Sequence, residues 1–302
     1  MSAKGTLVVI GGPTASGKTR AAALLARHYG TEVISADSRQ FYEAMRIGTA
    51  RPSEEELFGV PHHFLGHLDI HEAWSAGDFA RAAEPVLRTL MGHHGIAILV
   101  GGSGLYIDAL VKGLDPMPAM DDTVRERLQH RFQLEGLPPL LAELERLDPA
   151  TFDRIDRNNP HRVIRALEVC VSTGRPFSSH HSTPADRTDL QIVRLAMDVP
   201  RPQLYTAIDA RVDRMIAEGL VEEVRSLLPH RAHNALRTVG YRELFAYFDG
   251  DCSLAQAIDQ VKQHTRNYAK RQMTWLRREA TWHWCVPTDL TMMQHHIDTA
   301  RS

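Results

Sequence analysis

Several features that would point to particular classes of protein are scarce in this chain of 302 residues. Its three cysteines, Cys170, Cys252 and Cys285, lie far apart. Their odd number and wide spacing fit neither a disulfide framework nor a zinc site, which favours a reducing compartment. No apolar run approaches the roughly 18 residues that a membrane-spanning helix needs. The first residues show no signal-peptide pattern, so we expect a cytoplasmic protein with no membrane partner.

An excess of charge of one sign is also lacking, since 35 Lys and Arg residues oppose 37 Asp and Glu residues. A nucleic-acid partner therefore has to be argued from local clusters of charge. Histidine is abundant, with 17 residues that include four adjacent pairs. Adjacent residues do not place two rings on one helix face, so we interpret the pairs as surface or loop histidines and not as a metal site. The pairs are His62–His63, His93–His94, His180–His181 and His295–His296.

What the sequence does contain is a globular composition that begins with an α/β pattern. Apolar residues make up 43% of the chain and charged residues 24%, and the length allows an α/β core with one further module. In the first third, strand and helix patterns alternate, which predicts a parallel sheet with helices on its faces. The expected strands are 6–11, 32–37, 63–68 and 96–100, and the expected helices are 18–29, 78–90 and 105–111.

The middle of the chain, residues 121–180, shows only helical patterns. We therefore predict a P-loop NTPase-like α/β fold with a parallel sheet flanked by helices. Residues 1–114 and 190–302 would form this core with basic C-terminal helices, and residues 115–189 would form an all-helical insertion domain. The expected helices of the insertion are 122–135, 138–146 and 160–173. After it we expect strands at 191–199 and 282–286 and helices at 202–228, 240–248 and 254–279.

A phosphate-binding loop follows the first predicted strand. Residues 12–19 match the pattern G-x-x-x-x-G-K-[ST] between a buried strand and a helix. Lys18 would reach phosphate oxygens, the Thr19 hydroxyl would bind Mg²⁺, and the backbone N–H groups would attract an anion. A glycine turn with a chance lysine is the alternative. The residues predicted to contact a polyphosphate or pyrophosphate are Gly12, Pro13, Thr14, Ala15, Ser16, Gly17, Lys18 and Thr19.

A carboxylate, Asp37, ends the second predicted strand. Because ligands in an open parallel sheet lie beyond the carboxyl ends of the strands, Asp37 would lie near the phosphate loop and could accept a proton. A helix N-cap is the other interpretation. The strand at 96–100 runs into a glycine-rich turn, Gly101 to Gly104, and lacks the acidic residue that helps an ATPase hold Mg²⁺. The turn suits close approach of a flat ligand or a backbone, although a plain turn is also possible.

The last predicted helix carries the strongest local charge asymmetry. Between residues 262 and 278 six cations occur without an acidic residue, and Tyr268 and Trp275 lie among them. Basic and aromatic side chains together are typical of RNA binding, whereas a solvated helix face usually mixes both signs. The cations are Lys262, Arg266, Lys270, Arg271, Arg277 and Arg278.

Two arginine pairs leave alternatives open. Arg211 and Arg214 could stabilise a pyrophosphate leaving group or pair with nearby carboxylates. Those carboxylates are Asp209, Asp213, Glu222 and Glu223. Arg162 and Arg165 lie on one side of a predicted helix start and could bind a phosphate or form ion pairs within the helix.

Six segments follow one another in order along the chain. They are Gly-Pro-Thr-Ala-Ser-Gly-Lys-Thr at 12–19, Ile-Ser-Ala-Asp-Ser-Arg-Gln at 34–40, Gly-Gly-Ser-Gly-Leu-Tyr at 101–106, Arg-Ala-Leu-Glu-Val at 165–169, Thr-Val-Gly-Tyr-Arg at 238–242 and Lys-Arg-Gln-Met-Thr-Trp-Leu-Arg at 270–277. Together they resemble the bacterial tRNA dimethylallyltransferases, also called tRNA isopentenyltransferases. The similarity extends over about residues 6–284, and the combination is specific although the phosphate loop alone is not.

The resemblance implies transfer of a dimethylallyl group from dimethylallyl diphosphate to N6 of the tRNA adenosine just 3′ of the anticodon. It implies that the loop binds the prenyl diphosphate with Mg²⁺ and not ATP, that Asp37 deprotonates the amine, and that Thr19 lies near the diphosphate. Lys18 with Arg211 or Arg214 would stabilise the leaving diphosphate. The partners would be dimethylallyl diphosphate and the anticodon stem-loop, which the helical insertion would clasp. We expect a monomer with no obligate protein partner.

The family pattern also suggests where tRNA binds. The matching positions are Asp37, Ser38, Arg39, Gln40, Ser103, Arg125, Asn159, Pro160, His161, Arg162, Val163, Arg237, Thr238, Val239, Gly240, Tyr241, Arg242, Lys270, Arg271, Gln272, Met273, Thr274, Trp275, Leu276 and Arg277. Ser103 stands where the family more usually has threonine, which keeps the hydroxyl. Because a stacked base could not enter the site, we expect the adenosine to swing out of its loop, near Gln40 and the turn from Gly101 to Gly104. A small-molecule or nucleoside kinase is the alternative function, and it would leave the basic helix without a role.

Overall fold

The computed structural model describes residues 5–114, 122–180 and 187–302. The chain forms two compact units, one of residues 1–112 with 186–302 and one of residues 113–185. The boundaries lie close to those expected for the α/β core and the helical insertion. Each unit has its own buried core, and the larger one contains the phosphate loop. No helix in the described part of the chain is both long and apolar enough to cross a membrane.

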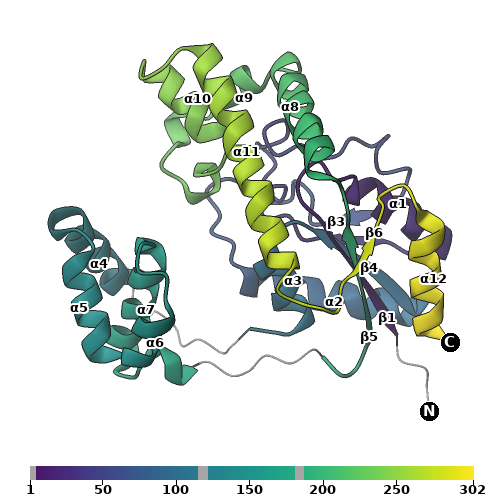
Figure 1. The fold of residues 1–302 in the computed structure, drawn as a ribbon, viewed down its shortest axis with the longest axis horizontal. Coiled ribbons are helices and arrows are strands. Elements are labelled where there is room, and N and C mark those ends of the chain that lie inside the picture. Colours follow the sequence, from purple (N-terminus) through teal and green to yellow (C-terminus); the bar gives the residue numbers. More distant parts are fainter. Residues whose placement is uncertain (1–4, 115–121, 181–186) are drawn as a thin grey trace. The chain divides into compact units, whose positions relative to one another are not determined.

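The larger unit is built on one sheet of six strands in the order β3-β2-β4-β1-β5-β6 (Figure 1). All its strand pairs are parallel. The strands are β1 (Thr6–Gly11), β2 (Val33–Ser35), β3 (His62–His63), β4 (Ile96–Gly101), β5 (Gln191–Met197) and β6 (His283–Cys285). Since β1 lies between β4 and β5, the phosphate loop leaves the middle of the sheet at the carboxyl end, where open parallel sheets bind ligands.

Helices cover both faces of this sheet because successive side chains of a strand point to opposite sides. Val8 and Ile10 of β1 share a core with α1 (Lys18–Tyr29) and α12 (Leu290–Arg301). Leu7 and Val9 lie in a second core with α2 (Ala76–His94) and α3 (Gly104–Val111). Strands buried on both faces have continuous apolar sequences, which is why the pattern predicted β1 and β4 well.

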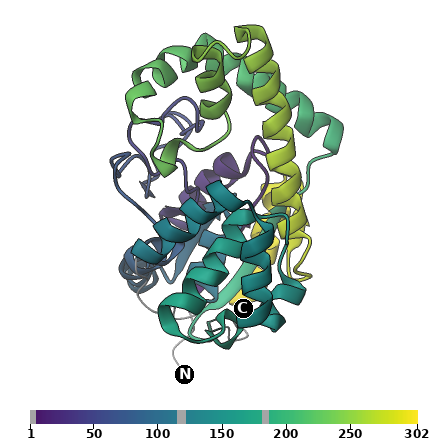
Figure 2. The same cartoon turned by 90° about the vertical axis from the view of Figure 1, so that its left-hand side faces the viewer.

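A lobe of four helices continues from the carboxyl end of β5 (Figures 1 and 2). It contains α8 (Arg201–Ala217), α9 (Leu220–Ser226), α10 (Tyr241–Phe248) and α11 (Leu254–Leu276). Ser253 caps α11 through a reciprocal pair of hydrogen bonds with Gln256, which defines where the helix begins. From there α11 runs past α8 and α10 and reaches α3 beside the sheet. The helix predicted to carry the basic stripe therefore passes the carboxyl ends of the strands.

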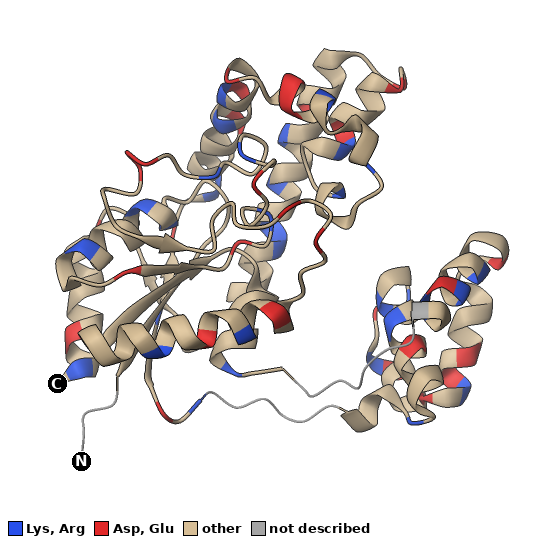
Figure 3. Ribbon diagram, turned by 180° about the vertical axis from the view of Figure 1, so that it is seen from behind, with Lys and Arg blue, Asp and Glu red and all other residues tan. Residues whose placement is uncertain are grey.

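In the described residues 122–180, all regular elements of the smaller unit are helices. It contains α4 (Asp122–Glu135), α5 (Pro138–Leu147), α6 (Pro149–Arg154), α7 (Pro160–Thr173) and a short 3₁₀ helix, Phe177–His180. Leu128, Leu140, Leu144 and Leu167 form its buried centre. Asp148 ties α6 to the segment after α7, since its carboxylate accepts hydrogen bonds from Thr151 and Ser178. Basic and acidic residues are mixed over the described helices of this unit (Figure 3).

The structure corrects the expected boundaries at places where the backbone takes a positive φ. The strand expected at 63–68 is only the two-residue β3, because Phe64 (φ 66°) and Gly66 (φ 57°) turn the chain. The helix expected at 202–228 is two helices, α8 and α9, separated at Gly219 (φ 102°). The patterns also missed α6 and α12, and the second of these completes the core beside α1.

Candidate active site

The phosphate loop joins β1 to α1 by a tight turn. Gly17, which precedes α1, has a φ of 82°, where a side chain would be strained. A Cβ on Gly12 would lie only 2.6 Å from the hydroxyl oxygen of Ser16. The loop borders a cavity of about 150 Å³. The Ser16 hydroxyl is buried and has no hydrogen-bond partner among the described residues, which fits a ligand that offers acceptor oxygens.

Two cations of the loop region lie in a poorly solvated environment. Lys18 is only 8% exposed, and its Nζ lies 3.4 Å from the Pro13 carbonyl oxygen. Burial lowers the pKa of Lys18 to about 8, and the positive charge of Arg211 lowers it too, whereas the negative charge of Asp37 raises it. Arg211 donates a hydrogen bond to the Thr14 hydroxyl at 3.3 Å, and burial also lowers its pKa. Both side chains would be stabilised by an anion in the cavity.

The two arginines of α8 differ in position. Arg211 borders the cavity of the phosphate loop, whereas Arg214 lies one helical turn further along and borders a neighbouring hollow that Arg211 also lines, but not the loop cavity. The carboxylates nearest to them in sequence are engaged elsewhere: Asp209 pairs with Arg266, and Asp213 pairs with Lys262 at 2.6 Å. No ion pair between described residues involves Arg211 or Arg214. Of the two, Arg211 is therefore placed to neutralise charge at the loop.

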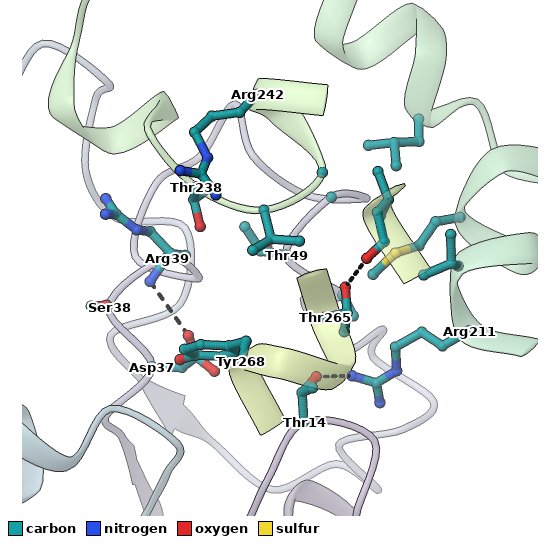
Figure 4. Close-up of a pocket in the computed structure, with 18 of the residues that line it drawn as sticks. Thr14, Asp37, Ser38, Arg39, Thr49, Arg211, Thr238, Arg242, Thr265 and Tyr268 are labelled. Carbon is teal, nitrogen blue, oxygen red and sulfur yellow. Dashed lines mark hydrogen bonds between the residues drawn. The ribbon is translucent and has the colours of Figure 1, made fainter. Parts of the chain in front are cut away.

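Asp37 lies two residues beyond β2, at the border of two cavities. No helix begins after it, so it is not a helix N-cap. Its carboxylate accepts a hydrogen bond from the Arg39 backbone N–H at 3.4 Å, and the Tyr268 ring lies beside it (Figure 4). Burial raises the pKa of Tyr268, and the negative charge of Asp37 raises it further. Tyr268 is thus part of the site. The sequence alone indicates it only as an aromatic residue of the basic helix.

A larger cavity, of about 370 Å³, opens beyond Asp37 (Figure 4). It shares Thr14, Asp37 and Arg211 with the smaller cavity, so the two adjoin at the catalytic carboxylate expected from the sequence. Its size and mixed polar and apolar lining are typical of a site for a small organic group. Segments far apart in sequence build its wall: Ser38 and Arg39, Gly48 to Ala50, Arg237 to Gly240, Arg242, Thr265, Tyr268 and Arg271.

The turn from Gly101 to Gly104 packs closely against other parts of the chain, which agrees with the expected close approach of a backbone. A Cβ on Gly101 would lie 2.3 Å from the Ala36 carbonyl oxygen, and one on Gly104 would lie 2.3 Å from the Trp275 ring. Gln40, the other expected neighbour of the base, donates to the carbonyls of the 49–50 segment. The cavity of about 370 Å³ beyond Asp37 offers space for a base.

Gln272 connects this turn to the phosphate loop. Its side-chain oxygen accepts a hydrogen bond from the Thr14 backbone N–H, and its Nε2 donates to the Gly102 carbonyl, both at 2.9 Å. The side chain is 5% exposed. A Cβ on Gly102 would lie 2.1 Å from Nε2, so glycine is needed for this contact. Gln272 therefore holds α11 against the loop, a supporting role that the sequence did not reveal.

Other positions implied to contact tRNA are also buried. Val163 is 0% exposed inside the smaller unit, and Leu276 is 1% exposed in the larger one. Tyr241 is fully buried, and its hydroxyl donates to Glu223, which also accepts N–H groups of the 46–48 segment. These side chains, like Gln272, maintain the fold in this structure and offer no surface to a nucleic acid.

The basic stripe of α11 is smaller than the sequence suggested. Arg266 and Lys262 are neutralised by carboxylates of α8. Lys270, Arg271 and Arg277 are exposed, and no ion pair between described residues involves them. Thr274 is exposed beside them, whereas Met273 and Trp275 are half-buried. Arg237 and Arg242, on the segment that lines the larger cavity, are exposed as well.

In the smaller unit, the residues expected to contact tRNA have different roles: one caps a helix and others are exposed. Asn159 accepts a hydrogen bond from the Arg162 backbone N–H and so caps α7. Arg165 forms an ion pair with Glu168 at 3.0 Å within the helix. An ion pair of this kind was one of the two alternatives for Arg162 and Arg165. Arg162, His161 and Arg125 are exposed. Asn159, His161 and Arg162 also border a largely apolar hollow of about 650 Å³ within this unit.

Several oxygen groups that could hold the expected Mg²⁺ lie around the loop. Thr19, Asp37 and Glu56 all line the smaller cavity. A hydroxyl and carboxylates are ligands that Mg²⁺ accepts, and the ion usually completes its shell with water and substrate phosphates. The residues present therefore fit a magnesium ion bound together with a diphosphate.

Comparisons with known proteins give a single answer. A family model described as IPP transferase matches residues 40–279. The tRNA dimethylallyltransferase of Christiangramia forsetii is 45% identical over 278 residues, which cover 92% of this chain and 92% of that protein. The tRNA dimethylallyltransferase 1 of Bacteroides fragilis is 42% identical over 287 residues, with 95% of each chain covered.

Solved structures agree with these relatives. The full-length tRNA isopentenylpyrophosphate transferase from Bacillus halodurans has a TM-score of 0.73 and 36% identity, and the similarity covers 99% of this chain and 97% of that one. A eukaryotic dimethylallyltransferase acting on tRNA shares the fold with a TM-score of 0.79 at 23% identity. As the ordered motifs predicted, the chain belongs to the IPP transferase family of tRNA dimethylallyltransferases.

Proposed function

We propose that this enzyme transfers the dimethylallyl group of dimethylallyl diphosphate to N6 of the adenosine just 3′ of the anticodon in tRNA, releasing diphosphate. The observation that carries the proposal is the position of Asp37 between two adjoining cavities. One cavity is lined by the phosphate loop and the other by polar, aromatic and basic groups. A donor in the first and an acceptor base in the second would meet at this carboxylate.

The donor half of the reaction depends on charge stabilisation. As the allylic carbon–oxygen bond breaks, negative charge builds on the diphosphate oxygens. The loop N–H groups, Lys18 and Arg211 would hold those oxygens, and their shielding from solvent strengthens the interaction. Mg²⁺, bound through Thr19 with Glu56 close by, would supply further positive charge. Arg211 takes this role in the proposal, and Arg214 does not border either cavity.

The acceptor half needs a base, because the adenine amine has a delocalised lone pair and is a poor nucleophile. Asp37 would accept a proton from N6 as the new C–N bond forms. The base has to leave its stack to reach this position. The Tyr268 ring, which borders the larger cavity beside Asp37, offers a surface on which it could stack (Figure 4).

The exposed cations outline a surface for the RNA backbone. Three of them, Lys270, Arg271 and Arg277, lie on α11. Arg237 and Arg242, near the rim of the larger cavity, are exposed as well. Arg242 has one weak neighbour, Glu243, at 3.7 Å. In the smaller unit, Arg125, His161 and Arg162 would contact the anticodon stem-loop. A kinase would make no use of these groups, so they favour the prenyltransferase, as the family assignment does.

Calorimetry tests the choice of donor. Dimethylallyl diphosphate and inorganic pyrophosphate should both bind in the presence of Mg²⁺, and each should displace the other. The Lys18→Met variant should bind neither, while the exposed-site control Lys270→Met should bind both as the parent does. Tight binding of ATP together with no binding of the allylic compound would refute the proposal.

A further inference from the structure

Three histidines outside the proposed active site lie close together in the larger unit. His71 is in the loop between β3 and α2, while His230 ends a 3₁₀ turn, Leu228–His230, and His233 precedes another, Asn234–Leu236. One ring nitrogen from each lies within 4.8 Å of the other two. The Nε2 of His71 lies 3.2 Å from the Nδ1 of His230. Among the described residues this is the one such group of three potential metal ligands.

The geometry suits a tetrahedral metal ion. Zn²⁺ binds imidazole nitrogens at about 2.0–2.1 Å, which places two ligand nitrogens of a tetrahedron roughly 3.3 Å apart. The distance between His71 and His230 is already close to this value. The backbone helps, because the His233 N–H donates to the His230 carbonyl at 2.9 Å and so fixes a turn that brings both rings to one side. The rings of His71 and His233 have centroids 4.6 Å apart.

The surroundings resemble those of a metal site in two further ways. The Nδ1 of His71 is hydrogen-bonded to the carboxylate of Asp69, which leaves Nε2 directed to the other histidines. Carboxylates that orient a ligating imidazole in this way are typical partners in zinc sites. The nearby cation Arg231 is occupied by Asp249 at 2.6 Å, so it does not oppose a bound cation.

We propose that His71, His230 and His233 bind one divalent transition-metal ion, for which Zn²⁺ is the best match, with a fourth position left for water. The ion would join the loop before α2 to the segment before α10. That segment also reaches the proposed active site, since the Asn234 carbonyl accepts a hydrogen bond from Arg39 at 3.1 Å and Arg237 lines the larger cavity. The metal would act as a clamp that holds this wall in place. This inference does not depend on the proposed function.

The test uses the full chain without a polyhistidine tag, stripped of metal by a chelator that is then removed. Zn²⁺ affinity is measured by competition with a chromophoric chelator, and Co²⁺ serves as a spectroscopic probe because tetrahedral Co²⁺ absorbs visible light much more strongly than octahedral Co²⁺. We expect one ion per chain and a tetrahedral Co²⁺ spectrum. Both should persist in excess Mg²⁺ and in the Lys18→Met variant, which separates this site from the phosphate loop.

Matched variants identify the ligands. Asp69→Asn should weaken Zn²⁺ binding by about 10–100-fold, and His230→Asn or His233→Asn by more than that. The control changes two exposed histidines that end α2, His93→Asn with His94→Asn, and should leave affinity unchanged. Circular dichroism checks that each variant is folded. Equal Zn²⁺ affinity in the parent and in folded His230→Asn, or binding abolished by the control, would overturn the proposal.

Discussion

Replacing Lys18 with methionine should make the folded protein more stable while it destroys the anion site. Methionine fills a similar volume without a charge. The pKa of Lys18 falls from 10.5 to about 8 in the folded state, chiefly because its side chain is buried. This difference corresponds to about 3 kcal/mol of unfavourable free energy for the protonated side chain in the fold.

The pH dependence of this effect has a definite sign. Below pH 8 the lysine is protonated in both states, and the folded state carries the full penalty. Between pH 8 and 10.5 the unfolded chain binds the proton that the folded chain has released. The free energy of unfolding of the parent therefore rises with pH, by up to about 1.4 kcal/mol per pH unit relative to the variant. Above 10.5 the charge contributes no difference.

Urea unfolding at two pH values measures the effect. At pH 7 Lys18→Met should be more stable than the parent by about 3 kcal/mol, and this advantage should shrink by roughly 2 kcal/mol at pH 9.5. The exposed control Lys270→Met should change little at either pH. Pyrophosphate with Mg²⁺ should stabilise the parent but not Lys18→Met. If the variant is no more stable than the parent at pH 7, the idea of a charge held ready for an anion is wrong.

Three further predictions concern other parts of the site. Asp37→Asn should lower the rate of prenyl transfer by about 10²–10⁴-fold with pyrophosphate binding retained, and normal single-turnover rates would remove the base assignment. Gly101→Ala should lower the melting temperature and impair transfer, because its Cβ would lie 2.3 Å from the Ala36 carbonyl oxygen that precedes Asp37; a parent-like melting curve would argue against that close approach. Lys270→Gln with Arg271→Gln should reduce the slope of log binding constant against log salt for tRNA by about 1.4–1.8, and an unchanged slope would remove this part of α11 from the RNA surface.

The parts of the fold that the sequence predicted well are those in which local pattern and burial agree. The apolar run before Gly12 is a central strand buried on both faces, and the helix at 160–173 begins at a proline after an asparagine cap and ends before Gly174. The phosphate loop was predicted for the same reason, since all its parts are adjacent in the chain. The strand at 63–68 failed because Phe64, a residue with no tendency to a positive φ, adopts one.

The parts of the site that the sequence did not predict are contacts between segments far apart in the chain. Gln272 lies 258 residues from Thr14, and nothing in its neighbourhood marks it as the side chain that holds the loop. Charge counting along α11 could not show that Arg266 is neutralised by Asp209, because the partner comes from another helix. The histidine cluster was hidden in the same way, since His71 and His230 are 159 positions apart and neither belongs to an adjacent pair.

The most direct measurement of the central claim is mass analysis of tRNA nucleosides after incubation with the enzyme, Mg²⁺ and dimethylallyl diphosphate, beside a parallel reaction with labelled ATP. We predict that one adenosine next to the anticodon gains a single five-carbon unit, that diphosphate is released in equal amount, and that Asp37→Asn gains almost none. Label transferred from ATP to an acceptor, with every adenosine left at its original mass, would contradict the account.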